Sequence, residues 1–100
     1  MYDHRVEGLV RSMGGSGLSC GFWALIDCIE AVRDGVQVHT ALAAAAAKEG
    51  ITVPTLRRRI RTLIDRMHRL GLEHYHLFWQ SARKPKPEEL IELAARSLPN

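Results

Sequence analysis

Residues 52–69, TVPTLRRRIRTLIDRMHR, carry the clearest amphipathic pattern in the chain. On a helical wheel of about 100° per residue, six apolar side chains fall on one side and form a stripe wide enough to pack on a core. These side chains are Val53, Leu56, Ile60, Leu63, Ile64 and Met67. Residues 57–69 also hold six arginines and a single acidic residue, Asp65, so this segment has a formal charge of +5 in a chain of net charge +3. We therefore expect a helix that packs by its apolar side and exposes a basic face.

The residues at both ends of this segment predict its limits. Thr52 can cap the N-terminus, because its hydroxyl can accept a bond from an N–H of the first turn. Pro54 suits that turn, where its missing N–H costs nothing. Gly71 can end the helix in a left-handed conformation.

The alanine-rich run ALAAAAAK at residues 41–48 predicts a second helix immediately before the basic one. Alanine has the highest helix propensity, and small side chains let another helix approach closely. We expect Thr40 to cap this helix and Gly50 to make the turn that follows it. Residues 41–69 then have the order of a helix-turn-helix.

The basic face has the chemistry of a nucleic-acid-binding surface. Arginine is planar, permanently charged and bidentate, which suits phosphate oxygens and the edge of guanine. Arg58 and Arg61 fall near the pole opposite the apolar stripe. The alternative is an ordinary solvated face of an amphipathic helix, which would normally mix charges of both signs.

Length and composition indicate a single domain spanning residues 1–100. The chain is long enough for one core and too short for two, and its 46% hydrophobic and 25% charged residues are typical of a globular protein. It has no signal sequence and no apolar run as long as about 18 residues, so we expect a cytoplasmic protein and no membrane partner. Cys20 and Cys28, on what we predict to be one helix, would lie about 12 Å apart and could not pair.

Two segments precede the alanine-rich run. Residues 1–13 form a short, weakly amphipathic segment that ends in a glycine-rich turn. Residues 22–32 are the most apolar part of the chain, and we predict that they form the central core helix. Ser16 or Ser19 can cap it, and Gly35 can end it.

The C-terminal third is less regular. Residues 72–82 suit a short helix on the core, although their alternation also fits a strand, and we favour the helix. Residues 83–87 contain basic residues and two prolines, which predict an extended basic linker. Pro87 opens a final helix over residues 87–98, and its buried side would hold Leu90, Ile91, Leu93, Ala94 and Leu98.

Three blocks of the chain, taken together, resemble one known family. Residues 13–32, MGGSGLSCGFWALIDCIEAV, are similar to its opening block at Gly14, Gly21 and Phe22. Residues 55–65, TLRRRIRTLID, are similar to its recognition helix at Leu56, Arg58, Ile60, Arg61 and Ile64. Residues 84–98, KPKPEELIELAARSL, are similar to its last helix at Lys84, Pro85, Glu89, Ile91, Ala94 and Leu98. The family is the C-terminal DNA-binding effector domain of the stage-zero master response regulator, which commits endospore-forming bacteria to sporulation.

The chain also departs from that family. The connections around residues 34–40 and between Gly71 and Lys84 are shorter. Glu49 stands at an apolar aromatic position of the family, and Arg57 stands at an acidic one, so the target DNA sequence need not carry over. Nothing in the 100 residues resembles a phosphoacceptor receiver domain, and the resemblance therefore does not imply control by phosphorylation.

The resemblance implies an all-α fold, a single compact domain of about five or six helices, and binding of the recognition helix in the DNA major groove. It implies that base edges are contacted by Arg58 and Arg61, flanked by Thr55 and Thr62. The predicted phosphate contacts are Lys48, Arg57, Arg59, Arg66, Arg69, Arg83, Lys84 and Lys86. The expected partners are double-stranded DNA, RNA polymerase and a second copy of the chain. The second copy would pair as a homodimer or bind in tandem on DNA.

Other chemistries have weaker signals. His68, His74 and His76 have a loose spacing with no cysteine pair nearby, and neither cysteine has a predicted catalytic partner. We therefore expect no metal, no cofactor and no enzymatic activity. Trp23 and Trp79 fall on apolar faces and are expected in the core.

One alternative function stays open, a helical protein-interaction module that pairs with or antagonises a related full-length regulator. It would use a face formed by the core helix and the last helix.

Overall fold

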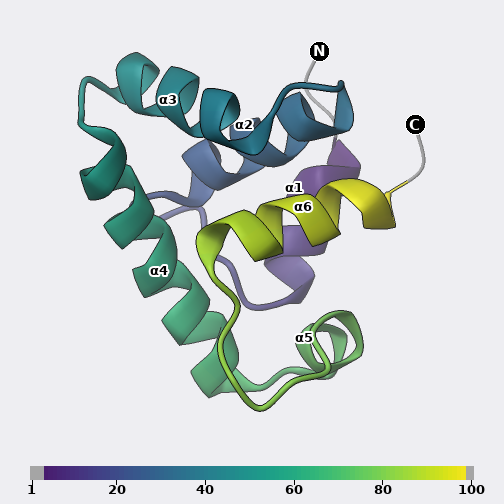
Figure 1. Cartoon of the computed structure of the whole chain (residues 1–100). Coiled ribbons are helices and arrows are strands. Elements are labelled where there is room, and N and C mark those ends of the chain that lie inside the picture. Colours follow the sequence, from purple (N-terminus) through teal and green to yellow (C-terminus); the bar gives the residue numbers. More distant parts are fainter. Residues whose placement is uncertain (1–3, 99–100) are drawn as a thin grey trace.

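Helix α2 (Phe22–Arg33) is the centre of the fold, as predicted for the most apolar segment. The computed structural model describes residues 4–98, and α2 packs against α1, α3, α4 and α6 within them (Figure 1). The other helices are α1 (His4–Ser12), α3 (Val38–Glu49), α4 (Val53–Leu70), α5 (Glu73–Phe78) and α6 (Pro87–Ser97). The part of the chain that the structure describes contains no strand, and the predicted all-α class with five or six helices is confirmed.

The N-terminus of α2 differs from the prediction. Neither Ser16 nor Ser19 caps it, and the N-cap is Gly21, whose φ of 89° lies in the left-handed region. The main-chain carbonyl of Ser19, rather than its side chain, accepts a bond from the Phe22 N–H (3.2 Å). The C-terminus agrees with the prediction, because Gly35 has a φ of 99° and the Val36 N–H returns to the Ala31 carbonyl (3.0 Å).

Cys20 and Trp23 lie in other places than predicted. Cys20 precedes α2 instead of lying on it and is exposed, whereas Cys28 is buried. Trp23 is 47% exposed and stacks edge-on against Phe22. Because α2 begins at residue 22, its first turn points Phe22 into the core and leaves Trp23 at the surface.

Helix α3 begins earlier than expected. Its first residue is Val38 and its N-cap is Gln37, so Thr40 lies inside the first turn and does not cap the helix. The side chain of Val38 packs against the core, which favours an early start even though no side chain caps it. The buried side of α3 holds Ala41, Leu42, Ala45 and Ala46.

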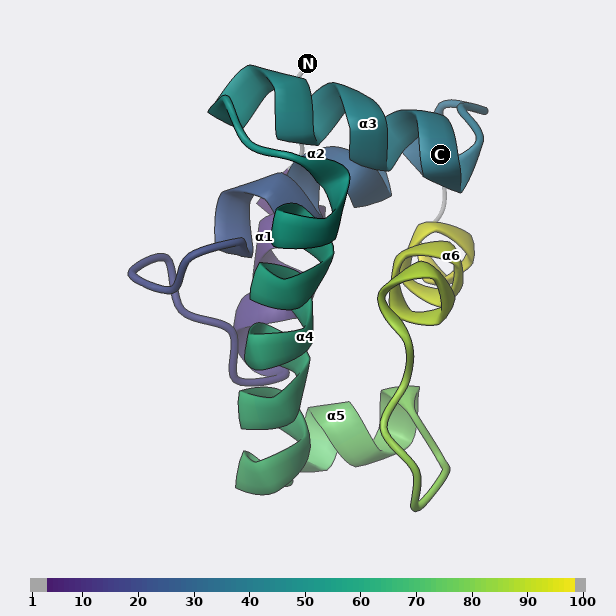
Figure 2. The same cartoon turned by 60° about the vertical axis from the view of Figure 1, so that its left-hand side comes forward.

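The turn between α3 and α4 has the predicted chemistry. Gly50 has a φ of 69°, and the Ile51 N–H donates to the Ala46 carbonyl (3.0 Å). The Thr52 hydroxyl accepts a bond from the Thr55 N–H (3.3 Å), and Pro54 lies in the first turn of α4. The observed helices correspond to the predicted helix-turn-helix over residues 41–69, and α3 crosses the N-terminal end of α4 (Figure 2).

Helix α4 buries the predicted stripe, Leu56, Ile60, Leu63, Ile64 and Met67, with Val53 half-buried. It ends at Gly71 (φ 59°), as predicted. After it, residues 73–78 form the short helix α5 that the sequence favoured over a strand. The Tyr75 side chain is buried, and its hydroxyl lies 2.8 Å from Nδ1 of His68.

The final helix begins at Pro87 as predicted, and its core-facing residues include Leu90, Ile91 and Ala94, while Leu93 and Leu98 are half-buried. Within residues 4–98, none of the helices combines the length and the apolar character needed to cross a membrane.

Candidate nucleic-acid interface

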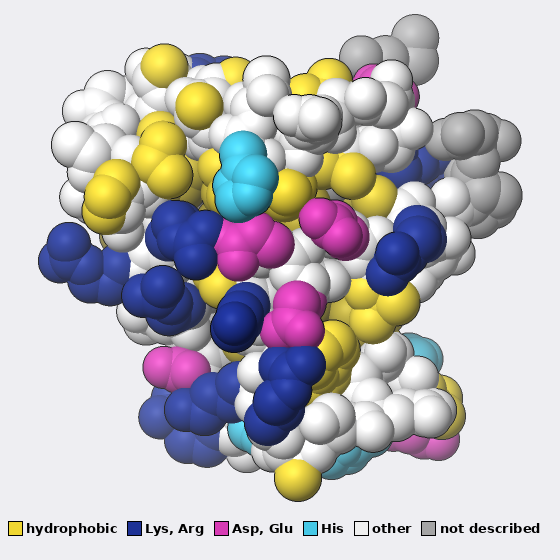
Figure 3. Space-filling model, in the orientation of Figure 1, with side chains coloured by type: hydrophobic (Ala, Val, Ile, Leu, Met, Phe, Trp, Pro, Cys, Tyr) yellow, Lys and Arg dark blue, Asp and Glu magenta, His cyan; other side chains and the backbone are white. Residues whose placement is uncertain are grey.

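Arg58 and Arg61 lie on the solvent face of α4, opposite the buried stripe. Both side chains are exposed, and within the described residues neither forms an ion pair or a side-chain hydrogen bond. In Figure 3 the Lys and Arg side chains gather on the side of the molecule where α4 runs in Figure 1. The two guanidinium groups are therefore free to bind an external anion or a base edge.

The two threonines predicted beside these arginines are also near the surface. The Thr55 hydroxyl oxygen accepts a bond from the Thr52 hydroxyl (3.0 Å), which leaves the Thr55 proton free to be donated. The Thr62 hydroxyl donates to the Arg58 carbonyl (3.1 Å) and keeps only its accepting capacity.

The flank of α4 that faces the C-terminal segment is largely neutralised. Arg57 forms an ion pair with Glu88, and their side chains are only 26% and 19% exposed. Lys84 forms a second pair with Asp65 (3.1 Å), which lies on α4 itself. Two predicted phosphate contacts are thus held by carboxylates of the same molecule.

The predicted basic linker is held in place by hydrogen bonds within the chain, so Arg83 is not available as a free positive charge. Arg83 donates two bonds to the Glu89 carboxylate (2.8 and 2.7 Å), and the Trp79 indole N–H donates to the Arg83 carbonyl (2.6 Å). The bond from Arg83, with a further bond from the Lys86 N–H (2.8 Å), lowers the pKa of Glu89 to about 2. Arg83 therefore binds within the chain, while the Lys86 side chain is exposed.

The flank that faces α2 and α3 is more open. A guanidinium nitrogen of Arg59 lies 3.9 Å from a carboxylate oxygen of Glu49, and Lys48 pairs with Asp27 (3.1 Å) while its side chain remains 73% exposed. Exposed pairs of this kind contribute about 0–1 kcal/mol, so a phosphate can displace them easily. Arg66 and Arg69 are exposed and have no ion pair within residues 4–98.

A hollow on this flank includes two residues that the sequence did not predict to be part of the binding site. Ser19 and Cys20, from the turn before α2, line it together with α4 residues, which are Arg59, Thr62, Leu63, Arg66 and Arg69. Ser19 and Cys20 lie about 40–50 residues before the α4 residues of this hollow in the sequence, and no local pattern links the two segments.

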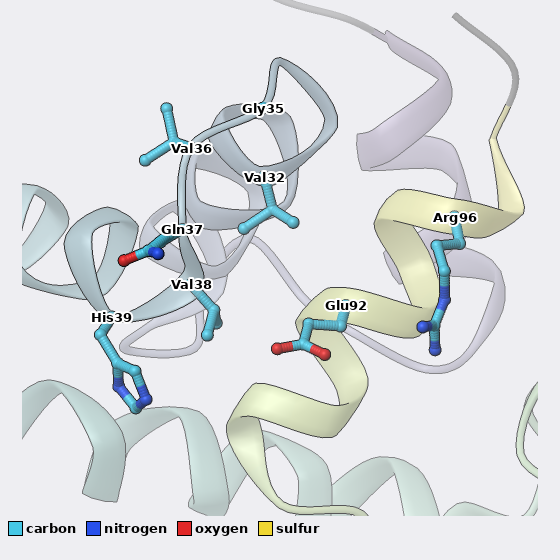
Figure 4. Close-up of a pocket in the computed structure, with 8 residues that line it drawn as sticks. All are labelled: Val32, Gly35, Val36, Gln37, Val38, His39, Glu92 and Arg96. Carbon is cyan, nitrogen blue, oxygen red and sulfur yellow. The ribbon is translucent and has the colours of Figure 1, made fainter.

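A second hollow lies between the α2–α3 turn and α6 (Figure 4). Val32, Val36 and Val38 form its apolar wall, and the charged side chains at its edge are Glu92 and Arg96 of α6. Because these two charges have opposite sign, this hollow lacks the uniform positive lining found beside α4.

His68 and Cys28, which were considered for metal binding or catalysis, lie in environments that do not suit those roles. The His68 ring forms a hydrogen bond with the Tyr75 hydroxyl, and no group of three side chains that could bind a metal ion occurs in the described part of the chain. Burial, with a smaller effect from Asp27, raises the pKa of Cys28 to about 12, so this thiol stays protonated at neutral pH.

Comparisons with models of protein families, with curated proteins and with solved structures found no match to this chain.

Proposed function

We propose that this chain is a sequence-specific double-stranded DNA-binding transcriptional regulator whose helix α4 enters the major groove. The observation that carries the proposal is the exposure of Arg58 and Arg61 on a helix whose opposite side is anchored by five buried apolar residues. A fixed helix that presents unpaired guanidinium groups meets the geometric requirement for bidentate contacts with guanine.

The surroundings of α4 support the same function. The short turn at residues 50–52 holds α4 against α3, which is the arrangement of a helix-turn-helix. The three-block resemblance to the sporulation regulator effector domain favours a bacterial, cytoplasmic regulator of that kind. Thr55 and Thr62 are further base-contact candidates, and the open flank with Arg59, Arg66 and Arg69 is suited to phosphates.

The expected affinity is modest. Two bidentate Arg–guanine pairs provide about 1–3 kcal/mol of discrimination each, and the remaining attraction is electrostatic. A single copy should therefore bind weakly and depend steeply on salt. Stable occupancy then requires two copies on adjacent sites, as a homodimer or in tandem, or an additional contact such as one with RNA polymerase.

The proposal is tested by selecting bound sites from a random duplex pool and measuring affinity for the enriched duplex at two salt concentrations. The double variant Arg58→Ala/Arg61→Ala should lose the enriched motif and most of the specific affinity. The control is Arg96→Ala, an exposed arginine in the last turn of α6, which is the end of that helix farther from α4 (Figure 1), and it should bind like the parent.

The opposite result is equally informative. If no motif is enriched, and if the double variant binds duplex DNA as the parent does, the proposal is wrong. Dimers in solution together with indifference to DNA would instead support the protein-interaction module.

A further inference from the structure

The hollow between α4 and the turn before α2 is lined by three arginines and two hydroxyl groups, together with Cys20 and Leu63. Arg59, Thr62, Arg66 and Arg69 are spaced by three or four residues, so they form one row along the helix. Ser19 and Cys20 face this row from the neighbouring turn.

A close backbone contact holds the turn against α4. A Cβ atom placed on Gly21 would lie 3.2 Å from both the carbonyl carbon and the Cβ of Arg59. A side chain here would push the Arg59 backbone away by a few tenths of an ångström, and the φ of 89° also favours glycine. The turn and the arginine row are therefore fixed relative to each other by the fold.

The charged side chains that line the hollow are all positive. None of the described residues that line it is acidic, and Arg66 and Arg69 have no ion pair within residues 4–98. The opposite flank of α4 differs, since Arg57 of α4 and Lys84 of the segment beside it are bound by carboxylates. Anions should accordingly favour the flank that carries the hollow.

We infer that this hollow binds a phosphate group and that, on DNA, this group is a backbone phosphate at the edge of the groove that Arg58 and Arg61 enter. The second half of the inference rests on the proposed function. Arg69 lies eight residues beyond Arg61, which is about 12 Å along a helix. The major groove is about 12 Å wide, so the arginine row reaches the strand that borders it. The turn before α2 then becomes a second element in contact with DNA.

Cys20 provides a direct probe of the hollow. It is the exposed one of the two cysteines, whereas Cys28 is buried. We compare its rate of reaction with an anionic disulfide, 5,5′-dithiobis(2-nitrobenzoate), and with a neutral reagent, iodoacetamide. The ratio of the two rates should be about fivefold lower in Arg66→Gln/Arg69→Gln than in the parent, because two nearby charges no longer attract the anionic reagent. The control Arg96→Gln should keep the parent ratio.

Two ligands distinguish a free phosphate from a backbone phosphate. Inorganic phosphate should slow the anionic reagent more than chloride does at equal ionic strength, and this effect should disappear in Arg66→Gln/Arg69→Gln. Duplex DNA should protect Cys20 from the neutral reagent. Thermal unfolding of each variant checks that the fold is retained, which we expect because both arginines are exposed.

The outcomes separate the two halves of the inference. An unchanged rate ratio in Arg66→Gln/Arg69→Gln, with equal effects of phosphate and chloride, overturns the phosphate site even if the protein binds DNA. A phosphate effect without protection by DNA supports the anion site and contradicts its role on DNA. Protection by DNA that depends on Arg66 and Arg69 supports both halves.

Discussion

Arg57 of α4 forms an ion pair with Glu88 at the beginning of α6, and both side chains are mostly shielded from water. With the Lys84–Asp65 pair, it fastens one flank of α4 to the C-terminal segment. The cations of α4 thus fall into two groups, a flank neutralised within the molecule and a face that remains open to an external anion.

The Glu88→Gln variant should bind duplex DNA more tightly at low salt, because Arg57 no longer has an internal carboxylate. If Arg57 gains one phosphate contact, the slope of log affinity against log salt should steepen by about 0.9. The loss of the pair should lower the free energy of unfolding by about 1–3 kcal/mol, because the pair is mostly shielded from water and Arg57 loses its partner. Affinities at several salt concentrations and urea unfolding measure both effects.

The matched control for that variant is Glu92→Gln, which removes an exposed α6 carboxylate with no ion pair in the described residues. A Glu88→Gln variant whose salt slope equals that of this control would show that Arg57 does not reach DNA.

Thr52→Ala should lower the free energy of unfolding by about 1 kcal/mol, because the hydroxyl that caps α4 is lost. For a domain of this size, the melting temperature should fall by about 4–8 °C. Thr40→Ala is the matched control, since Thr40 is exposed and lies within the first turn of α3 without capping it. Equal effects of the two substitutions would contradict the assigned helix starts.

Gly21→Ala should destabilise the protein more than Gly35→Ala does. Both glycines have a positive φ, 89° and 99°, and both variants therefore incur a backbone strain of about 1–2 kcal/mol. Only at Gly21 would the new methyl group also press on the Arg59 backbone, whereas nothing lies within 4 Å at Gly35. Chemical denaturation of both variants measures the difference, and equal losses would indicate that α2 and α4 are not in close contact.

Glu89→Gln should make the protein less sensitive to acid. The pKa of Glu89 is lowered from 4.5 to about 2 in the folded state, chiefly by the Arg83 hydrogen bond, so its contribution to stability is present above pH 4.5. That contribution is lost as the pH falls from 4.5 toward 2. Urea midpoints measured over this window should fall more steeply for the parent than for Glu89→Gln. Parallel curves would contradict the role of the Arg83–Glu89 bond.

The helix-turn-helix could be predicted because its signals are local. Thr52, Pro54 and Gly71 act on their own turns of the chain, and the apolar stripe of α4 repeats at helical spacing. The predicted start of α3 at Ala41, with Thr40 as its cap, is wrong, because tertiary packing of Val38 outweighs the capping preference of a threonine.

The candidate site was only partly predictable for a different reason. The exposure of Arg58 and Arg61 follows from the helical period alone. The pairing of Arg57 with Glu88, and the placement of Cys20 beside Arg66, depend on contacts between segments far apart in the sequence. A single sequence carries no information on such contacts until the fold is known.

The turn between α3 and α4 consists of Gly50, Ile51 and Thr52 alone, and hydrogen bonds fix it on both sides. The two helices should therefore move as one rigid body, so that any tilt of α3 also tilts α4. A signal that controls this protein has no hinge to act on at this turn. Under the proposed function, such a signal would act elsewhere, for example by covering the arginine face.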